Sequence, residues 1–190
     1  MGKFEGFGFY TVDVEYLRFL NSKDSEVYYN SSYAQAIKPF VGVIIDVAEY
    51  EYFIPLTSAK VKHERWKNVC DEHFLIYEII DKEINISGDI YKDYSEKEKM
   101  HVLAVLDVKK MIPVPKDAYS KVVFAELEDT RYKDLFEKEY AFCLNIREKI
   151  LARVEKIYKR QKVTKTVRRA YCDFSCCEIA LEEWIDEKTT

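Results

Sequence analysis

The sequence contains few of the features that mark secreted, fibrous or membrane proteins. Glycine (5) and proline (4) are scarce among 190 residues, and 34% of the residues are charged, which argues against disorder, collagen-like repeats and a linker-rich design. The longest apolar run, 40–45, has about six residues, far short of the roughly 20 that cross a bilayer. The start of the chain shows no apolar signal core and no cleavage site. We therefore expect an intracellular, cytoplasmic protein.

Cysteine usage gives no sign of a disulfide framework. The number is odd (5), and no two cysteines form a C-x-x-C pair. Cys172, Cys176 and Cys177 lie close together, but no second group of cysteines or histidines completes a tetrahedral zinc site. We expect reduced, mostly buried thiols, and neither a metal nor a cofactor.

Several common catalytic motifs are missing. The chain has no G-x-x-x-x-G-K-[ST] or G-x-G-x-x-G loop and no G-x-S-x-G elbow. Its three histidines, His63, His73 and His101, are dispersed. The obvious acidic residues are expected on surfaces or in the tail, which does not favour a two-metal nuclease. A ribonuclease that works without a metal remains open.

The pattern of apolar residues predicts one α+β domain over 1–190, with strands in the first two-thirds and helices at the end. Hydrophobic residues make up 48% and aromatic residues 15%, enough for a sizeable core. The expected strands are 6–14, a hairpin over 39–58 with its turn near 48–51, 74–80 and 102–108. A short helix is expected over 14–20, followed by a long loop to residue 38, and 122–127 is left open between strand and helix start.

The clearest expected element is a long helix over about 130–161. It carries one apolar stripe at helical spacing: Phe136, Tyr140, Cys143, Ile146, Ile150, Val154 and Ile157. Its length, roughly 48 Å, leaves open whether it is interrupted. Ser175 and Glu178, spaced as a capping box, predict a final helix over 176–186.

Positive charge is concentrated between residues 153 and 169. Eight lysines and arginines stand there against one acid, Glu155, so the segment carries +7. Since the whole chain carries −4, the remainder carries −11. Such asymmetry lets an acidic protein present a stripe for phosphate groups. The alternative is a solvated helix face whose charges are neutralised by its neighbours.

One segment, 55–63, holds every group that metal-free RNA cleavage needs. In such cleavage the 2′-OH of RNA attacks the adjacent phosphate, while the protein positions the groups and stabilises the extra negative charge. The segment supplies hydroxyls, lysines and a histidine directly after a strand. A helix starting near Ser58 would add free backbone N–H groups. The alternative is that Ser58 only caps that helix and that the lysines are solvent-exposed.

Four motifs, in order, resemble those of one family. They are FYTV and YLRFL at 9–20, KPFVGV at 38–43, YFIPLTSAK at 52–60 and CDFS at 172–175. Together they are similar to the motifs of the ToxN/AbiQ family, the endoribonuclease toxins of type III toxin–antitoxin systems.

The resemblance implies a compact, strongly twisted antiparallel sheet with a barrel-like core and flanking helices. It also implies metal-independent cleavage of cellular or phage RNA, at adenine-rich sites, that leaves a 2′,3′-cyclic phosphate. The implied partner is a small repeat RNA folded as a pseudoknot, which the toxin cuts from a precursor and which bridges toxin subunits in a symmetric assembly.

The motif match assigns Ser58 as the main catalytic residue, beside Thr57, with Lys60 and Lys38 near the phosphate. Since an exposed lysine titrates near 10.4, we expect the two lysines to stabilise charge rather than to remove a proton. The family's tyrosine precedes the lysine by four positions, where this chain has an alanine, so Tyr33, one residue earlier, is the candidate to replace it. His63 is expected to titrate in the range useful for an acid or base.

The basic stripe then becomes part of a groove for RNA, with tyrosines available for base stacking. The expected RNA-binding residues are Tyr29, Lys62, Arg65, Lys159, Arg160, Lys162, Lys165, Arg168 and Arg169. Two other readings stay open: an RNA-binding module without catalysis, and a protein-interaction domain with an acidic partner.

Overall fold

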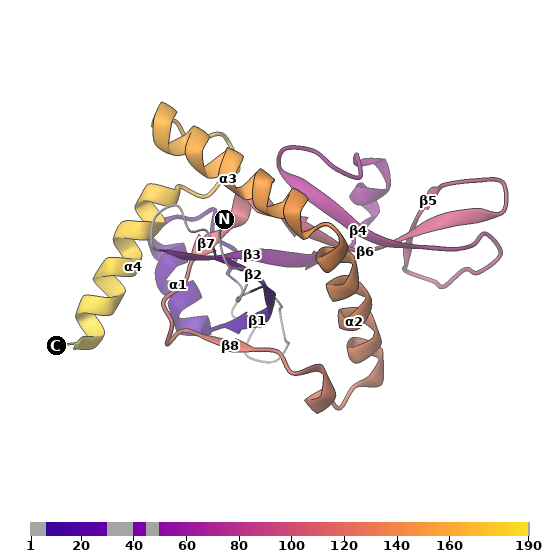
Figure 1. Cartoon of the computed structure of the whole chain (residues 1–190), viewed down its shortest axis with the longest axis horizontal. Coiled ribbons are helices and arrows are strands. Elements are labelled where there is room, and N and C mark those ends of the chain that lie inside the picture. Colours follow the sequence, from indigo (N-terminus) through magenta and orange to yellow (C-terminus); the bar gives the residue numbers. More distant parts are fainter. Residues whose placement is uncertain (1–6, 30–39, 45–49, 190) are drawn as a thin grey trace.

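The computed structural model describes residues 7–29, 40–44 and 50–189, and one mixed set of strands and helices occupies them (Figure 1). The strands are β1 (Gly8–Val12), β2 (Phe40–Ile44), β3 (Glu51–Ser58), β4 (His73–Asp81), β5 (Ile90–Asp93), β6 (Glu98–Asp107), β7 (Ile112–Pro113) and β8 (Tyr119–Lys121). The helices are α1 (Val14–Lys23), α2 (Thr130–Asn145), α3 (Arg147–Thr164) and α4 (Phe174–Thr189). The 3-10 helices within the described residues are η2 (Val61–Arg65), η3 (Val108–Lys110) and η4 (Phe124–Glu126). The predicted α+β class is confirmed.

All strand pairs in the sheet are antiparallel, in the order β4-β6-β3-β2-β1-β8, with β5 beside β6 and β7 beside β3. The sheet is not closed into a barrel, because within the described residues the end strands β4 and β8 do not pair. The reason lies in the long strand β6, which pairs with β3 at one end and with β5 at the other. Its far half therefore leaves the core as an arm with β4 and β5 (Figure 1).

The predicted hairpin of β2 and β3 is confirmed where it is described. Phe40 pairs with Pro55, and the register runs on to residue 44 opposite Glu51. On its other edge β3 pairs first with β7, through Tyr52 and Phe53, and then with β6, from Leu56 to Ser58. Pro55, which has no N–H to donate, lies between these two partners, where a missing donor is tolerated.

The long helix is interrupted at Ile146. Its backbone N–H is shared between the carbonyls of Phe142 and Cys143, at 3.3 and 3.2 Å, and α3 then starts in a new direction. The predicted apolar stripe nevertheless faces the core on both sides of the break, since Phe136, Cys143 and Ile150 are all buried. The segment 122–127, left open by the sequence, contains the short helix η4.

The final helix begins earlier than predicted. The backbone N–H groups of Ser175 and Cys176 donate to one carboxylate oxygen of Asp173, at 3.0 and 3.1 Å. Asp173 therefore caps α4, and the predicted capping box of Ser175 and Glu178 is wrong. Glu178 turns inward instead, and Ser175 Oγ accepts from Lys162 at 2.9 Å.

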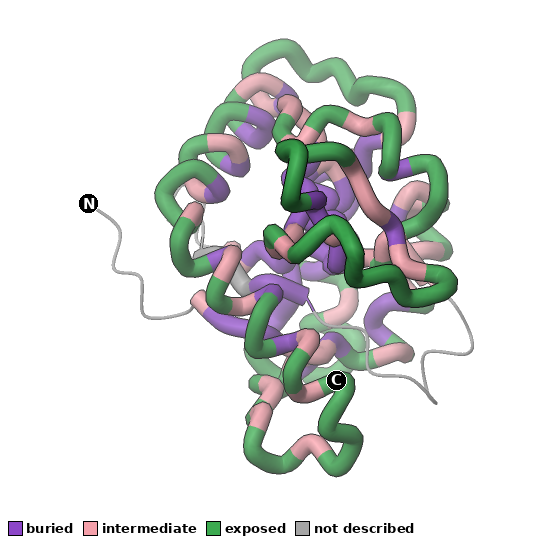
Figure 2. The backbone as a smooth tube through the Cα atoms, turned by 90° about the vertical axis from the view of Figure 1, so that its right-hand side faces the viewer, coloured by how far each residue is buried: buried purple, intermediate pink, exposed green. Residues whose placement is uncertain are grey.

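Glu178 is the polar centre of the main core. One of its oxygens accepts from the hydroxyls of Tyr52 and Tyr158, at 2.7 and 2.8 Å, and the other pairs with Lys162. Since these residues lie on α4, β3 and α3, a single buried carboxylate joins two helices to the strand that leads to Ser58. Figure 2 shows the buried segments gathered in the interior, with exposed segments around them.

A second, smaller cluster supports the arm. It is formed by Leu75, Ile90, Val102 and Val105, with Trp66 and Tyr77 packed against it. None of the helices that the structure describes is long and apolar enough to span a membrane.

Candidate active site

The end of β3 opens into a pocket of about 290 Å³. Its lining includes Thr57, Ser58, Lys60 and His63, four of the six predicted catalytic residues. Thr57 and Ser58 are the last two residues of β3, paired there with Val105 and Ala104 of β6, and both belong to the lining. Neither of these hydroxyls, nor the Lys60 ammonium, has a hydrogen-bond or ion-pair partner in the described part of the chain. They are free to meet a ligand.

A short helix follows the strand and brings His63 back to the pocket. The His63 backbone N–H donates to the Lys60 carbonyl at 2.7 Å, and the Lys60 backbone N–H donates to His63 Nδ1 at 2.9 Å. The sequence left open a helix start near Ser58, but β3 continues through Ser58 and η2 begins at Val61. The polar groups that line this pocket are therefore contributed by side chains and not by a helix that starts at Ser58.

The sequence suggested that His63 titrates near neutrality, but in the structure its pKa lies well below that range. His63 is only 3% exposed, and its ring packs on Trp66 with 4.5 Å between the two ring centroids. Burial, with the positive charge of Lys62 nearby, lowers its pKa from 6.5 to about 4. Because Nδ1 accepts a hydrogen bond, the neutral ring carries its proton on Nε2. His63 is therefore a neutral hydrogen-bond donor at pH 7.

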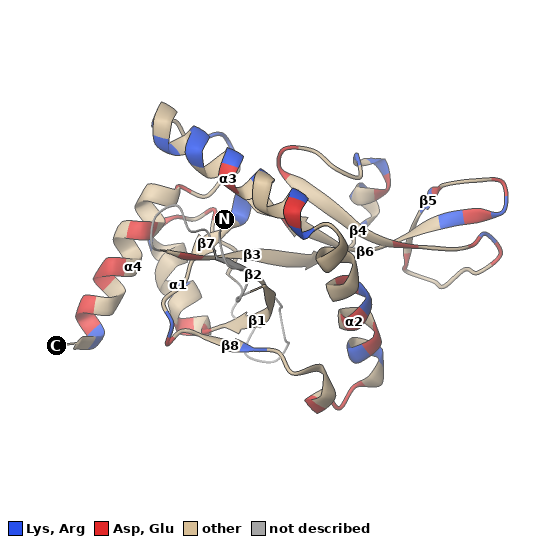
Figure 3. Cartoon of the chain, viewed as in Figure 1, with Lys and Arg blue, Asp and Glu red and all other residues tan. Residues whose placement is uncertain are grey.

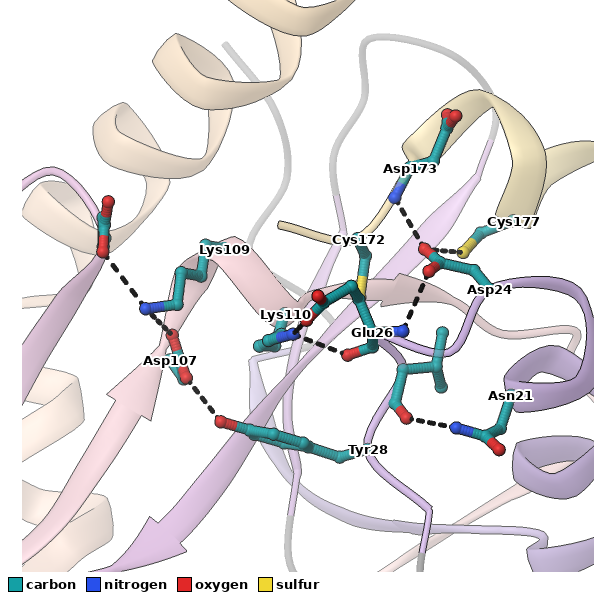
Figure 4. Close-up of polar contacts among 12 residues, drawn as sticks. Asn21, Asp24, Glu26, Tyr28, Asp107, Lys109, Lys110, Cys172, Asp173 and Cys177 are labelled. Atoms are coloured by element: carbon teal, nitrogen blue, oxygen red, sulfur yellow. Dashed lines mark hydrogen bonds and ion pairs between the residues drawn. The ribbon is translucent and has the colours of Figure 1, made fainter. Parts of the chain in front are cut away.

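The pocket contains residues that the sequence analysis missed, Tyr28, Trp66 and Asp107. The Tyr28 hydroxyl donates to Asp107 at 2.8 Å, and the Lys109 ammonium lies 3.9 Å from the other oxygen of Asp107 (Figure 4). Burial raises the pKa of Asp107, although Lys109 and the Tyr28 hydroxyl oppose that rise. One signal in the sequence could have pointed to Asp107: it is a single charged residue directly after the apolar run 102–106.

Acidic residues are not confined to surfaces, contrary to the expectation from the sequence. Asp107, Glu139 and Glu178 are all buried. They lie apart from one another, and in the described ranges no group of three or more His, Cys, Asp or Glu side chains could hold a metal ion.

The other predicted site residues differ in how far they can be placed. Lys38 and Tyr33 lie outside the described residues. Tyr29 is half-buried against the main core. Lys62 lines the pocket with its ammonium 5.2 Å from the Trp66 ring centroid, and Arg65 is exposed on the same short helix.

The basic stripe is partly neutralised by its neighbours. Lys162 pairs with the buried Glu178, Lys159 pairs with Glu155 at 3.1 Å, and the Arg160 guanidinium lies 5.5 Å from the ring centroid of Tyr171. The other three predicted RNA-binding residues of this segment are Lys165, Arg168 and Arg169. Their side chains are exposed and have no hydrogen-bond or ion-pair partner in the described ranges. Figure 3 shows this basic end of α3 close to the more acidic α4.

The sequence and the fold match one known class of toxin. The family model of the ToxN toxin of type III toxin–antitoxin systems matches residues 8–183. The chain therefore belongs to the ToxN family, as its four motifs indicated.

Individual relatives agree with this assignment. The chain is 29% identical to endoribonuclease ToxN of Bacillus thuringiensis subsp. kurstaki, over 93% of this chain and 83% of that protein. It is 27% identical to endoribonuclease AbiQ of Lactococcus lactis subsp. lactis, over 88% and 81%. A solved structure described as showing selective toxin inhibition by a non-coding RNA pseudoknot matches with a TM-score of 0.72 and 26% identity, over 94% of this chain and 97% of that chain.

Proposed function

We propose that this chain is an endoribonuclease toxin that cleaves RNA without a metal ion and leaves a 2′,3′-cyclic phosphate. The proposal rests chiefly on one observation: Thr57, Ser58, Lys60 and His63 line a single pocket, with both hydroxyls and the ammonium unengaged. The family and the names of the relatives supply the reaction class. The pocket supplies the groups that carry it out.

The reaction needs a proton path and charge stabilisation. The 2′-oxygen of RNA forms a bond to phosphorus while the bond from phosphorus to the 5′-oxygen breaks. The Ser58 hydroxyl takes the proton from the 2′-OH as it passes its own proton to water, and the leaving 5′-oxygen takes up a proton from water. Lys60, and Lys38 by motif match, stabilise the additional negative charge on the phosphorane. Thr57 orients the phosphate beside Ser58.

His63 acts in this scheme as a hydrogen-bond donor. Its neutral ring holds a proton on Nε2, which has no partner in the described part of the chain, and it lines the pocket. A phosphate bound there raises the pKa of the imidazole, since an opposite charge favours the charged form. Substrate binding therefore moves His63 toward the range in which it can also release a proton to the 5′-oxygen.

The inhibitor of this activity is a small folded RNA. A non-coding RNA pseudoknot inhibits the toxin in the matched structure, and we extend that to this chain, with the RNA bridging toxin subunits in a symmetric assembly. Lys62 and Arg65 beside the pocket, with Lys165, Arg168 and Arg169 at the end of α3, provide unpaired charges for phosphate groups. The substrates are messenger RNAs of the cell or of a phage, cut in the cytoplasm at adenine-rich sites.

The test compares wild type, Ser58→Ala and Ser87→Ala on an adenine-rich RNA in EDTA, each protein being freed of partner RNA. Ser87 is exposed in the arm, and its hydroxyl has no hydrogen bond within the described residues, so it is a matched control. We expect Ser58→Ala to lower the cleavage rate by about 10²-fold or more, the control to match wild type, and the new 3′ ends to be cyclic phosphates.

Three outcomes would redirect the assignment. Bound but uncut RNA with wild type indicates a binding module without catalysis. Equal cleavage by all three proteins places the active site elsewhere. A protein-interaction domain is favoured only if none of the proteins binds RNA.

A further inference from the structure

Cys70 and His73 form a second reactive cluster, beside the pocket rather than in it. The Cys70 Sγ atom lies 3.0 Å from His73 Nδ1, and His73 Nε2 lies 2.9 Å from the Lys67 carbonyl oxygen. A carbonyl only accepts, so Nε2 carries the ring proton and Nδ1 accepts from the thiol. Hydrogen bonds thus link a nucleophile, the Cys70 thiol, to a base, the His73 ring, and that base to the Lys67 carbonyl that orients it.

A tight turn holds this geometry. The Cys70 backbone N–H donates to the His73 carbonyl at 3.1 Å, and Val69 pairs with Phe74 in an isolated β-bridge. The Glu72 backbone N–H points at the Cys70 sulfur, at 3.3 Å. Such an N–H group stabilises a thiolate, and so does the imidazolium that forms when His73 takes the thiol proton.

The acidic neighbours of Cys70 are already neutralised. Asp71 pairs with Arg153 and Lys156, each at 3.0 Å, and Glu72 pairs with Lys109 at 3.1 Å. Arg153 also donates to the Cys70 carbonyl oxygen. The thiol is therefore surrounded by paired charges and N–H donors, not by free carboxylates.

The other four cysteines lack this setting. Cys143, Cys172 and Cys177 are buried, and burial raises the pKa of each thiol. Cys176 is partly exposed like Cys70, but burial and the nearby carboxylates of Asp173 and Asp24 raise the pKa of its thiol. Among the described residues, no histidine contacts any of these four sulfurs.

Two aromatic contacts connect the pair to the pocket. The ring centroid of His73 lies 4.6 Å from that of Trp66, and Trp66 lies 4.5 Å from His63. Trp66 and His63 both line the pocket. A single indole ring therefore lies between the rings of His73 and His63.

We propose that Cys70 and His73 form a peroxide-reactive thiol pair whose oxidation shuts the neighbouring pocket. The regulatory half of this proposal rests on the proposed RNA cleavage. In the step, His73 takes the thiol proton and the thiolate attacks one oxygen of hydrogen peroxide. The O–O bond breaks, sulfur gains that oxygen as a sulfenic acid, and the other oxygen leaves as water with the proton from His73. Sulfur is oxidised by two electrons and the peroxide is reduced.

The proposed link to the pocket is the contact between sulfur and imidazole. Oxidation replaces the thiol proton that His73 Nδ1 accepts, across 3.0 Å, by an OH group on sulfur, and the imidazole ring shifts to accommodate it. Trp66 then loses its contact with His73, and His63 loses the indole face that positions it.

The first experiment measures thiol reactivity and needs no RNA. The protein is treated with limiting iodoacetamide, and alkylation of Cys70, in the tryptic peptide 68–82, is compared by mass spectrometry with alkylation of Cys176. We expect Cys70 to react at least about tenfold faster, and His73→Gln, which cannot take the thiol proton, to remove most of that difference. Equal rates at Cys70 and Cys176 in wild type overturn the proposal.

The second experiment measures the link to the pocket. Trp184→Phe leaves Trp66 as the one tryptophan, and this variant is compared with Trp184→Phe/Cys70→Ala before and after hydrogen peroxide. We expect peroxide to change Trp66 fluorescence and to lower RNA cleavage at least about tenfold only where Cys70 is present. Unchanged fluorescence and cleavage in an oxidised Cys70 protein overturn the regulatory link. If the untreated protein does not cleave RNA, the proposed function fails, while alkylation and fluorescence still decide the thiol pair.

Discussion

The backbone N–H of Lys60 donates to Nδ1 of His63 at 2.9 Å, so the residue that faces the phosphate in our scheme also fixes the tautomer of the neighbouring histidine. The hydrogen bond closes a five-residue 3-10 helix directly after the strand that carries Ser58. It leaves the Nε2 proton of His63 as the one the ring can offer to a ligand.

Stability should depend on His63 in mildly acidic solution. Its pKa is lowered from 6.5 to about 4 in the folded protein, so the unfolded chain takes up the proton first as the pH falls. The stabilising effect is complete above pH 6.5 and is lost as the pH falls toward 4. We expect this contribution of His63 to the free energy of unfolding to be about 1–2 kcal/mol, a value that allows for solvent access from the pocket. Urea unfolding of wild type and His63→Gln at pH 7.5 and pH 5 measures it, and identical pH dependence in both proteins contradicts it.

Glu139 should have the opposite pH dependence. Burial raises its pKa from 4.5 to about 8, and one of its oxygens has no hydrogen-bond partner. The folded protein holds the proton more tightly, so stability is full below pH 4.5 and falls as the pH rises through 8. Glu139→Gln should remove this loss, worth roughly 3 kcal/mol between pH 5 and pH 9. The exposed Glu137→Gln on the same helix is the control; if it behaves like Glu139→Gln in thermal unfolding, the assignment to Glu139 fails.

The ion pair of Lys162 with Glu178 should contribute to stability more than the ion pair of Lys159 with Glu155. Glu178 is 7% exposed, whereas the side chains of Lys159 and Glu155 are 58% and 49% exposed. Lys162→Met leaves a buried carboxylate short of one partner and should lower the unfolding free energy by about 1–3 kcal/mol. Lys159→Met should change it by less than about 0.5 kcal/mol. Equal losses in denaturant titrations count against the difference in burial as the cause.

RNA affinity should depend on the unpaired end of the stripe. Because Lys162 has a structural partner, charge changes at Arg168 and Arg169 test phosphate binding more cleanly. Each substitution to alanine should weaken binding and reduce the slope of log affinity against log salt by about 1. Lys116→Ala, in an exposed loop, should leave the slope unchanged. Filter binding at several salt concentrations measures this, using the cleavage-deficient Ser58→Ala background; an unaltered slope in the arginine variants excludes these contacts.

Periodic elements were predictable from the sequence, and features created by tertiary contacts were not. The stripe that contains Phe136 and Ile150 predicted the helices, because helical spacing is a local property. Asp173 displaced Ser175 as the cap of α4 because Glu178, the other half of the expected capping box, is drawn inward by two tyrosines and Lys162.

The same distinction holds for the candidate site. Thr57, Ser58, Lys60 and His63 could be chosen because they are neighbours in the sequence. Tyr28 and Asp107 could not, since they are 79 residues apart and meet only in the folded protein. The burial that lowers the pKa of His63 depends in part on Trp66, which packs against its ring.

The hydrogen bond between Tyr52 and Glu178 also bears on how the protein is made. Tyr52 lies on the strand that ends at Ser58, whereas Glu178 lies in the last helix. During translation the strand emerges from the ribosome long before its buried partner does, and a chain that stops short of α4 never acquires that partner. Prematurely terminated chains therefore lack the contact that joins β3 to α4, so the strand that leads to Ser58 is held less firmly in incomplete copies of the chain.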